Sequence, residues 1–212
     1  MQLIGMLDSP YVRRVAISLQ LLDIEFEHRS ISVFSEYEQF QQINPVVKSP
    51  SLVCDDGQVL MDSTLILDYA QALASAGKSL MPTNLSERQQ TLCVLGLALA
   101  ACEKGVQILY EHKLRPPEKI HQPWVERITA QLLVALGELE AELGRRPLAC
   151  SSSSINQAGV TTAVIWHFMQ MMLPEFAVAE KYPNLHHFST QAEMLPEFMA
   201  APHGASTYRR AG

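Results

Sequence analysis

The stretch LIGMLDSPYVRR, residues 3–14, decides how the chain begins to fold. Its first five residues form a short apolar run that predicts a strand. Ser9-Pro10 then predicts a helix start, because proline is favoured at the first helical position and a hydroxyl residue before it is a common N-cap. Such a junction points free backbone N–H groups and a hydroxyl toward whatever lies above the strand end, which suits an anion. By itself the pair predicts only a helix start, and its meaning depends on two later segments, Lys48-Ser49-Pro50 and Asp62-Ser63.

Segments typical of strands and helices alternate over the first 81 residues. Asp55-Asp56-Gly57 is a hairpin turn signal between two short apolar runs. Ser63 is expected to cap a helix that runs to about Ala76 and is closed by Gly77. The other predicted elements are a helix over 10–22, strands over 24–27, 51–54 and 59–61, and an irregular or helical stretch over 35–43.

After residue 81 the pattern is helical throughout. Helices are predicted from Ser86 to about Leu114, over 123–143 and over 157–173, with a further helix opening at Pro183. The sequence therefore predicts an α/β domain over residues 1–80, followed by an all-α domain over residues 86–212.

The composition is that of a soluble globular protein, with 48% hydrophobic and 18% charged residues. The net charge of −6, without Lys/Arg clusters, argues against nucleic acid or an anionic membrane as the main partner. No apolar run approaches the roughly 20 residues that cross a bilayer, and the N-terminus does not resemble a signal peptide. A cytoplasmic location is the resulting expectation.

The cysteines and histidines do not form a metal-binding pattern. Cys93 and Cys102 lie in an apolar helical stretch and are expected to be buried free thiols, consistent with a reducing compartment. His112 and the pair His186-His187 lack a cysteine or carboxylate at ligand spacing, so no metal site is predicted.

Three segments of the first half carry a family resemblance. SPYVR (residues 9–13), NPVVKSP (44–50) and DSTLI (62–66) resemble, in this order, the N-terminal domain of the cytosolic glutathione transferases. In the second half, YPNL (182–185) followed by PEF (196–198) resembles the closing helices of that family. The resemblance implies a thioredoxin-like α/β domain joined to an all-α domain, and a homodimer.

The resemblance also implies a site for the tripeptide glutathione. Pro50 is expected to be cis, leaving the backbone of Ser49 free to pair with the peptide, a small case of β-augmentation. Asp62 would accept from the γ-glutamyl ammonium, and Ser63 with the helix start would hold the γ-glutamyl carboxylate. Lys48 would neutralise a second carboxylate, at the glycyl end.

The implied catalytic residue is Ser9, as a hydrogen-bond donor to the glutathione thiolate. It is not expected to be a nucleophile, because no nearby base is suggested that could activate its hydroxyl. Tyr11 is a competing donor on the same turn. Tyr11, Gln107 and Tyr110 are candidates for a pocket that binds a second, apolar and electrophilic substrate.

Two departures from the family pattern are visible. Ser49 replaces the usual valine, which leaves a backbone contact intact. In the helix start at 156–160, Asn156 can act as the cap, and Ile155 with Val160 can form a hydrophobic staple. Gly159 replaces the family's aspartate, and the loss of that carboxylate is expected to cost about 1 kcal/mol.

The predicted function is a glutathione transferase of the detoxification type, with glutathione as co-substrate and no further cofactor. Two alternatives stay open: a related binding or regulatory protein without turnover, and a glutathione-dependent isomerase or dehalogenase. The junction Asp8-Ser9-Pro10 differs from the Ser-Ser-Cys start of the maleylacetoacetate isomerases, so the isomerase ranks lower.

Overall fold

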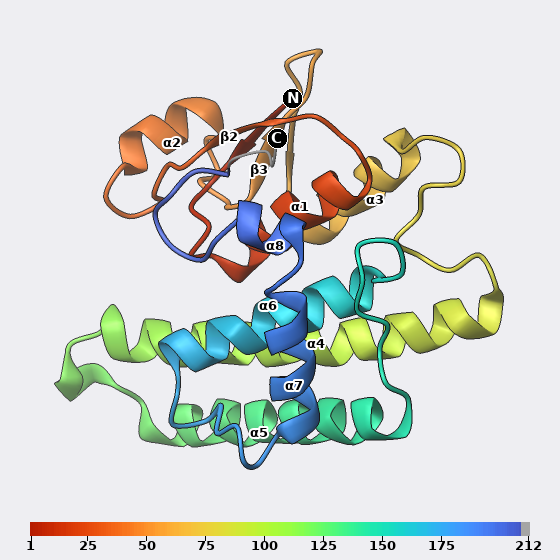
Figure 1. Cartoon of the computed structure of the whole chain (residues 1–212). Coiled ribbons are helices and arrows are strands. Elements are labelled where there is room, and N and C mark those ends of the chain that lie inside the picture. The colour runs from red at the N-terminus through yellow and green to blue at the C-terminus, as the bar shows by residue number, and fades with distance from the viewer. Residues whose placement is uncertain (209–212) are drawn as a thin grey trace. The chain divides into compact units, whose positions relative to one another are not determined.

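The computed structural model describes residues 1–208, which divide into two compact units (Figure 1). The described residues of the first unit are 1–80, 151–154 and 193–208. The second comprises residues 81–150 and 155–192. The predicted all-α domain over 86–212 thus differs from the structure at its C-terminal end, because the described residues 193–208 pack within the first unit.

The first unit is built on a four-stranded sheet in the order β2-β1-β3-β4. β1 and β2 run parallel, whereas β3 pairs antiparallel with both β1 and β4. The mixed sheet with its helices is the thioredoxin-like arrangement that the sequence predicts. The strands are β1 (Gln2–Ile4), β2 (Glu27–Arg29), β3 (Ser51–Val53) and β4 (Val59–Met61).

Helices cover both faces of this sheet (Figure 1). α1 (Pro10–Leu21) and α3 (Ser63–Leu73) pack against each other and against the strands. On the other face, Phe40 of α2 (Tyr37–Ile43) packs against Ile4 and Ile31 in a buried apolar cluster. The apolar spacing of the sequence therefore places α1 and α3 correctly, although α3 ends at Leu73 rather than near Ala76.

β2 begins three residues later than the predicted strand over 24–27. Its register pairs Glu27 with Gln2 and His28 with Leu3. His28 is buried in the middle of the strand, where its Nε2 lies 2.7 Å from the Gly5 carbonyl oxygen. The prediction relied on the alternation of apolar and polar residues over 24–27. His28 lies between two charged residues and therefore does not resemble a buried strand position, so the predicted strand begins too early.

The second unit is a helical bundle (Figure 1) that contains four α-helices, α4 to α7. α4 is the central helix and packs against α5 and α6, while α7 packs against α5 and α6. Asn84 caps α4 by accepting from the N–H groups of Ser86 and Glu87. The helices are α4 (Leu85–Lys113), α5 (Gln122–Arg145), α6 (Gln157–Met172) and α7 (Pro183–Ala192), with a 3-10 turn, η1 (Pro117–Lys119), between α4 and α5.

α4 is long and apolar enough, by length and composition alone, to cross a membrane. The expectation that no segment reaches this limit is therefore wrong for α4. A core helix of a soluble protein has the same composition, and α4 packs against α5 and α6. Cys102 is buried in this helix, as predicted, whereas Cys93 is exposed because it lies on the outer side of the same helix.

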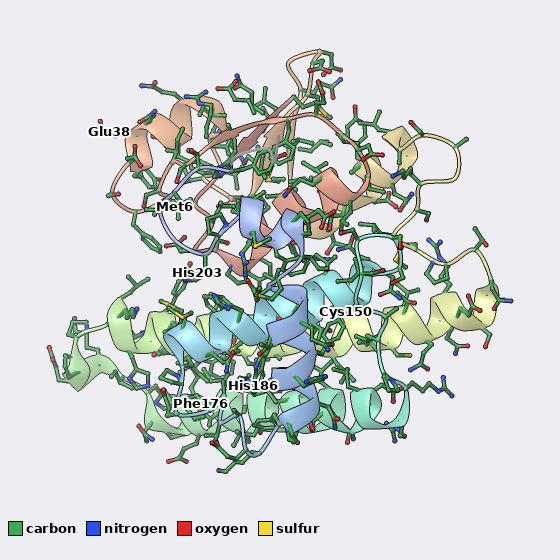
Figure 2. The ribbon with its side chains drawn as sticks, viewed as in Figure 1. Met6, Glu38, Cys150, Phe176, His186 and His203 are labelled. Atoms are coloured by element: carbon green, nitrogen blue, oxygen red, sulfur yellow. The ribbon has the colours of Figure 1, made fainter. Side chains whose placement is uncertain are left out.

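α6 and α7 complete the packing of the bundle. Trp166 of α6 is almost fully buried and meets Tyr182 edge-on, with ring centroids 5.6 Å apart. Figure 2 shows His186 on α7, where its Nδ1 lies 3.1 Å from the side-chain nitrogen of Gln170. Asn156 caps α6 by accepting from the N–H of Gly159 at 3.0 Å, which confirms the predicted cap.

Residues 193–208, which we call the C-terminal strap, return to the first unit and include the short helix α8 (Pro196–Ala200). Arg13 of α1 is the main anchor of the strap. Its guanidinium forms a bidentate ion pair with Glu193, at 2.7 and 2.6 Å, and its Nε donates to the Ala201 carbonyl at 2.8 Å. Because Arg13 is only 1% exposed, this pair is much less screened by water than a surface ion pair.

Candidate functional site

The register of the sheet brings three predicted segments to one end of neighbouring strands. Ile4, the last residue of β1, pairs with Ser51, the first residue of β3. Ser51 also pairs with Met61, the last residue of β4. The segment after Ile4, the segment before Ser51 and the segment after Met61 therefore emerge side by side. These segments carry Ser9, Lys48-Ser49-Pro50 and Asp62-Ser63, respectively.

Ser9 is the N-cap of α1, and Pro10 follows at the first helical position, as predicted. The half-buried Ser9 has an extended backbone, and its Oγ accepts from the N–H of Val12 at 3.5 Å. This contact uses a lone pair of the hydroxyl oxygen, so the hydroxyl hydrogen can still be donated to another group. Ser9 is thus both a helix cap and a potential donor.

The peptide bond between Ser49 and Pro50 is cis, which confirms the prediction for Pro50. Side chains of this unit hold the turn in place. The Asn44 amide donates to the Ser51 hydroxyl at 2.8 Å, and that hydroxyl donates to the Lys48 carbonyl at 2.7 Å. Ser49 itself is half-buried, while Pro50 is buried.

Gly5 allows the segment after β1 to approach this turn. It has a φ of +133°, and a Cβ atom built on it would lie 2.3 Å from the Ser49 Oγ. No side chain fits in that space, so glycine is required both by its φ and by the contact. The segment that leads to Ser9 therefore passes directly beside Ser49.

Lys48 is exposed, and among residues 1–208 its ammonium group has no ion-pair partner. Asp62 also has no ion-pair partner in that part of the chain. One of its oxygens accepts from the N–H of Thr64 at 2.9 Å. A cation and an anion that are both free to bind a charged ligand thus lie on two of the three converging segments.

The N-cap of α3 is Asp62, which corrects the expectation that Ser63 caps this helix. Asp62 has a φ of +75°, and its side chain accepts from the N–H of Thr64 in the first turn of the helix. Ser63 becomes the first helical residue and is buried. Its role at the predicted site therefore depends on its own hydroxyl and N–H, and not on capping.

Arg14 is a residue of this region that the sequence reasoning did not identify. It is 1% exposed, and its Nη1 donates to the Ser63 Oγ at 3.1 Å and to the Thr64 Oγ1 at 3.4 Å. A guanidinium is always charged, so it adds positive charge at the start of α3, where the helix dipole already favours an anion. The available signal was the pair Arg13-Arg14 in an otherwise apolar helix.

The three residues predicted for the second-substrate pocket lie on two helices in different units. Tyr11 is half-buried on α1. On α4, Gln107 donates to Glu103 at 3.0 Å, and Tyr110 is 46% exposed. Their common pocket stays a prediction.

Other possible sites in the described part of the chain are few. Within residues 1–208 there is no group of three or more His, Cys, Asp or Glu side chains that could hold a metal ion. A cavity of about 390 Å³ lies in the first unit, but no predicted glutathione-site residue lines it. Its walls are Met1, Gln20, Asp23, Ile24, Glu25, Phe26, Glu27 and Tyr208.

Comparison with known proteins finds similarity to glutathione transferases and to GST-like proteins. Residues 3–78 match the family described as "Glutathione S-transferase, N-terminal domain". Glutathione transferase GST 23 of Zea mays is 30% identical over 89 residues, which cover 42% of this chain and only 40% of the maize protein. The uncharacterized GST-like protein YibF of Escherichia coli is 24% identical over 84% of this chain and 87% of its own length.

A solved structure extends the similarity to nearly the full length. It is a glutathione transferase family member from Pseudomonas fluorescens with bound S-(propanoic acid)-glutathione. It is 28% identical, with a TM-score of 0.77, and the match covers 95% of this chain and 98% of that one. Residues 3–78 thus match the N-terminal domain of the glutathione S-transferases, and nearly the whole chain is similar to a member of the glutathione transferase family.

Proposed function

We propose that this protein is a glutathione transferase in which the Ser9 hydroxyl stabilises the thiolate of bound glutathione. The observation that carries the proposal is the register of the sheet, which gathers Ser9, Ser49-Pro50 and Asp62-Ser63 at one end of adjacent strands. The bound S-(propanoic acid)-glutathione of the Pseudomonas relative supports it, because that ligand is itself a glutathione with a substituted sulfur.

The charges at the strand ends are suited to a peptide with two carboxylates and one ammonium group. Asp62 would accept from the γ-glutamyl ammonium, and its remaining lone pairs are available beside the Thr64 contact. Ser63, polarised by Arg14, would donate its hydroxyl hydrogen to the γ-glutamyl carboxylate. Lys48 would pair with the glycyl carboxylate, while the backbone of Ser49 would pair with the cysteinyl residue.

The electrostatics of Ser9 are sufficient for thiolate formation. A free cysteine thiol has a pKa near 8.5, and lowering it by about two units needs roughly 2.7 kcal/mol. A hydrogen bond to a charged group contributes about 1.5–3 kcal/mol, and a helix N-terminus about 0.3–1 kcal/mol. Ser9 sits at the start of the 12-residue helix α1 and supplies both contributions.

The reaction that follows from this site is nucleophilic attack on an apolar electrophile. The glutathione sulfur forms a bond to an electron-poor carbon, and the leaving group departs with its bonding electron pair. Tyr11, Gln107 and Tyr110 stay the sequence-based candidates for contacts with the electrophile. We further propose a cytoplasmic homodimer with a role in detoxification. Phe34, Tyr37 and Val46, on α2 and its flanking segments, are exposed apolar side chains that a second copy could cover.

The test is a comparison of wild-type protein with Ser9→Ala against a panel of electrophiles and a peroxide. Ser9→Ala is expected to bind glutathione within a few-fold of wild type but to raise the pKa of the bound thiol by one to two units. That change predicts a ten- to hundred-fold lower kcat/KM at neutral pH. Ser35→Ala, which removes an exposed hydroxyl on the loop before α2, serves as the matched control.

Thiolate absorbance in the ultraviolet reports the pKa, and calorimetry reports glutathione binding. Binding without turnover of any substrate class would instead support a binding protein built on this fold. Equal kcat/KM in wild type and Ser9→Ala would exclude Ser9 as the thiolate donor, and Tyr11→Phe would then test the competing hydroxyl.

A further inference from the structure

The end of the C-terminal strap is held by alternate residues along β2 and its flanks. Phe26, His28 and Ser30 follow the two-residue period of an extended chain, so their side chains share one face. The ring of Phe26 stacks on Tyr208 with centroids 4.6 Å apart, and the Ser30 hydroxyl donates to the Ala205 carbonyl at 3.1 Å. Between these two contacts, the N–H of Tyr208 donates to the His28 Nδ1 at 2.9 Å.

The two neighbours of the His28 ring determine where its proton lies. On one side, Nε2 is 2.7 Å from the Gly5 carbonyl oxygen, which can only accept. On the other side, Nδ1 faces the backbone N–H of Tyr208, which can only donate. Both bonds exist together only in the neutral imidazole that carries its hydrogen on Nε2.

We propose that His28 is a pH-sensitive latch that holds the end of the C-terminal strap while neutral and releases it when protonated. Protonation places a hydrogen on Nδ1, which then meets the N–H of Tyr208 with no acceptor between the two donors. The bond from Nε2 to Gly5 survives protonation, because both ring nitrogens of the imidazolium are donors. Release is therefore confined to the strap side of the ring.

Burial favours the neutral form of His28 in the docked state. It lowers the pKa of His28 below the ordinary 6.5, and the Gly5 carbonyl opposes this only in part. Neither cause is a charged side chain. The ionisable residues on the surrounding elements are Asp8 after β1, Tyr11, Arg13 and Arg14 on α1, Glu27 and Arg29 on β2, and Glu193, Glu197, His203 and Tyr208 on the strap.

The direction of the pH effect follows from this shift. Release of the strap removes part of the burial of His28, so its pKa rises toward the ordinary 6.5 and the released state binds protons more readily than the docked state. The latch is therefore fully formed above pH 6.5 and is lost as the pH falls through the lowered pKa. Between these two values, the ratio of docked to released strap drops by up to tenfold per pH unit.

The first experiment follows the intact chain by NMR from pH 8 to pH 5. We expect the amide signal of Tyr208 and the ring signals of His28 to move with one common midpoint below 6.5. Hydrogen exchange of the amides over 203–208, divided by that of an unstructured peptide of the same sequence at each pH, should lose its protection over the same range. Unchanged protection between pH 8 and pH 5 would overturn the proposal.

Two substitutions separate the two sides of the ring. His28→Asn keeps an acceptor oxygen near the Nδ1 position and does not titrate, so strap protection should become independent of pH. His28→Gln keeps a donor near the Nε2 position but loses the acceptor, so the strap should be unprotected even at pH 8. A pH step in His28→Asn equal to that of wild type, or full protection in His28→Gln, would contradict the latch.

A third variant controls for the other charged anchor of the strap. Glu193→Gln removes the carboxylate that pairs with Arg13. Its strap should exchange faster overall but with the wild-type midpoint, whereas a shifted or absent midpoint would assign the pH step to Glu193 and overturn the role of His28. None of these measurements needs glutathione, so the latch and the proposed transferase activity can fail independently.

Discussion

Arg13 and Arg14 are adjacent on α1 and both 1% exposed, yet they have different partners. Arg13 pairs with the carboxylate of Glu193. Arg14 donates to the hydroxyl groups of Ser63 and Thr64 at the start of α3. Successive helix positions point in directions about 100° apart, so one dipeptide serves two neighbouring elements. One arginine stabilises the fold, and the other adds positive charge beside the proposed site.

At the residue scale, the substitution Asp62→Asn removes the negative charge of this side chain but keeps its role as the N-cap of α3. Asparagine keeps the oxygen that accepts from the Thr64 N–H, is as good an N-cap as aspartate and tolerates the positive φ. We expect an unchanged melting temperature but glutathione affinity about ten-fold lower, because roughly 1.4 kcal/mol of charged hydrogen bonding to the ligand ammonium is lost.

Calorimetric titration with glutathione measures this change, and an analogue lacking the α-amino group should bind both proteins equally. Asp56→Asn, in the β3–β4 hairpin, provides the control. Equal glutathione affinity in wild type and Asp62→Asn would show that Asp62 does not contact the ammonium group.

At the scale of elements, the sequence predicted the segments with strong local signals. Ser9-Pro10 and Asn156 start helices where expected, and the Asp55-Asp56-Gly57 turn joins β3 to β4. The capping role of Asp62 could not be predicted, because either Asp62 or Ser63 can cap and only the backbone conformation decides between them. The register that gathers the proposed site depends on long-range strand pairing, which the order of the motifs suggests only through the family resemblance.

Gly159 shows how packing can reverse a local preference. The sequence presents it as a weakness of the α6 start, but a Cβ at this position would lie 2.8 Å from the Ile155 Cγ1 and 3.3 Å from the Phe188 ring. Glycine is therefore needed for the first turn of α6 to approach these two side chains, and the family's aspartate would not fit without rearrangement.

We accordingly expect Gly159→Ala to lower the free energy of unfolding by about 1–2 kcal/mol, since overpacking outweighs the better helix propensity. The control is Gly137→Ala on α5, where a Cβ meets nothing within 4 Å. That substitution should instead stabilise the protein by up to about 1 kcal/mol. Urea unfolding measures the free energy of unfolding of both variants. Equal stabilisation by the two substitutions would show that the side chains of Ile155 and Phe188 move at little cost to make room for the Cβ.

At the scale of the whole molecule, the first unit is discontinuous in sequence. Arg13 and Glu193 are 180 positions apart, yet they form the least exposed ion pair that the described residues contain. Sequence reasoning assigned the strap to the helical domain because PEF (residues 196–198) follows the helices of that domain without a break. Its place in the first unit follows from tertiary contacts, such as those of Arg13, Phe26, His28 and Ser30.

Arg13→Met tests how much this anchor contributes. The substitution keeps an unbranched apolar stem but leaves Glu193 unpaired and the Ala201 carbonyl without its donor. We expect the free energy of unfolding to fall by about 2–4 kcal/mol. Lys78→Met breaks the exposed pair between Lys78 and Asp23 and should change it by less than about 1 kcal/mol. If both substitutions lower the free energy of urea unfolding by a similar amount, the buried Arg13 pair stabilises the protein no more than the exposed Lys78 pair.

The discontinuity of the first unit has a consequence for the protein's biosynthesis. At about 5–20 residues per second, a ribosome needs roughly 6 to 23 seconds to add the 113 residues between positions 80 and 193. During that interval, the nascent sheet and helices carry the Arg13 guanidinium without its carboxylate and lack the Tyr208 ring beside Phe26. Of the two units, the one that bears the proposed site thus begins to leave the ribosome first and is completed last.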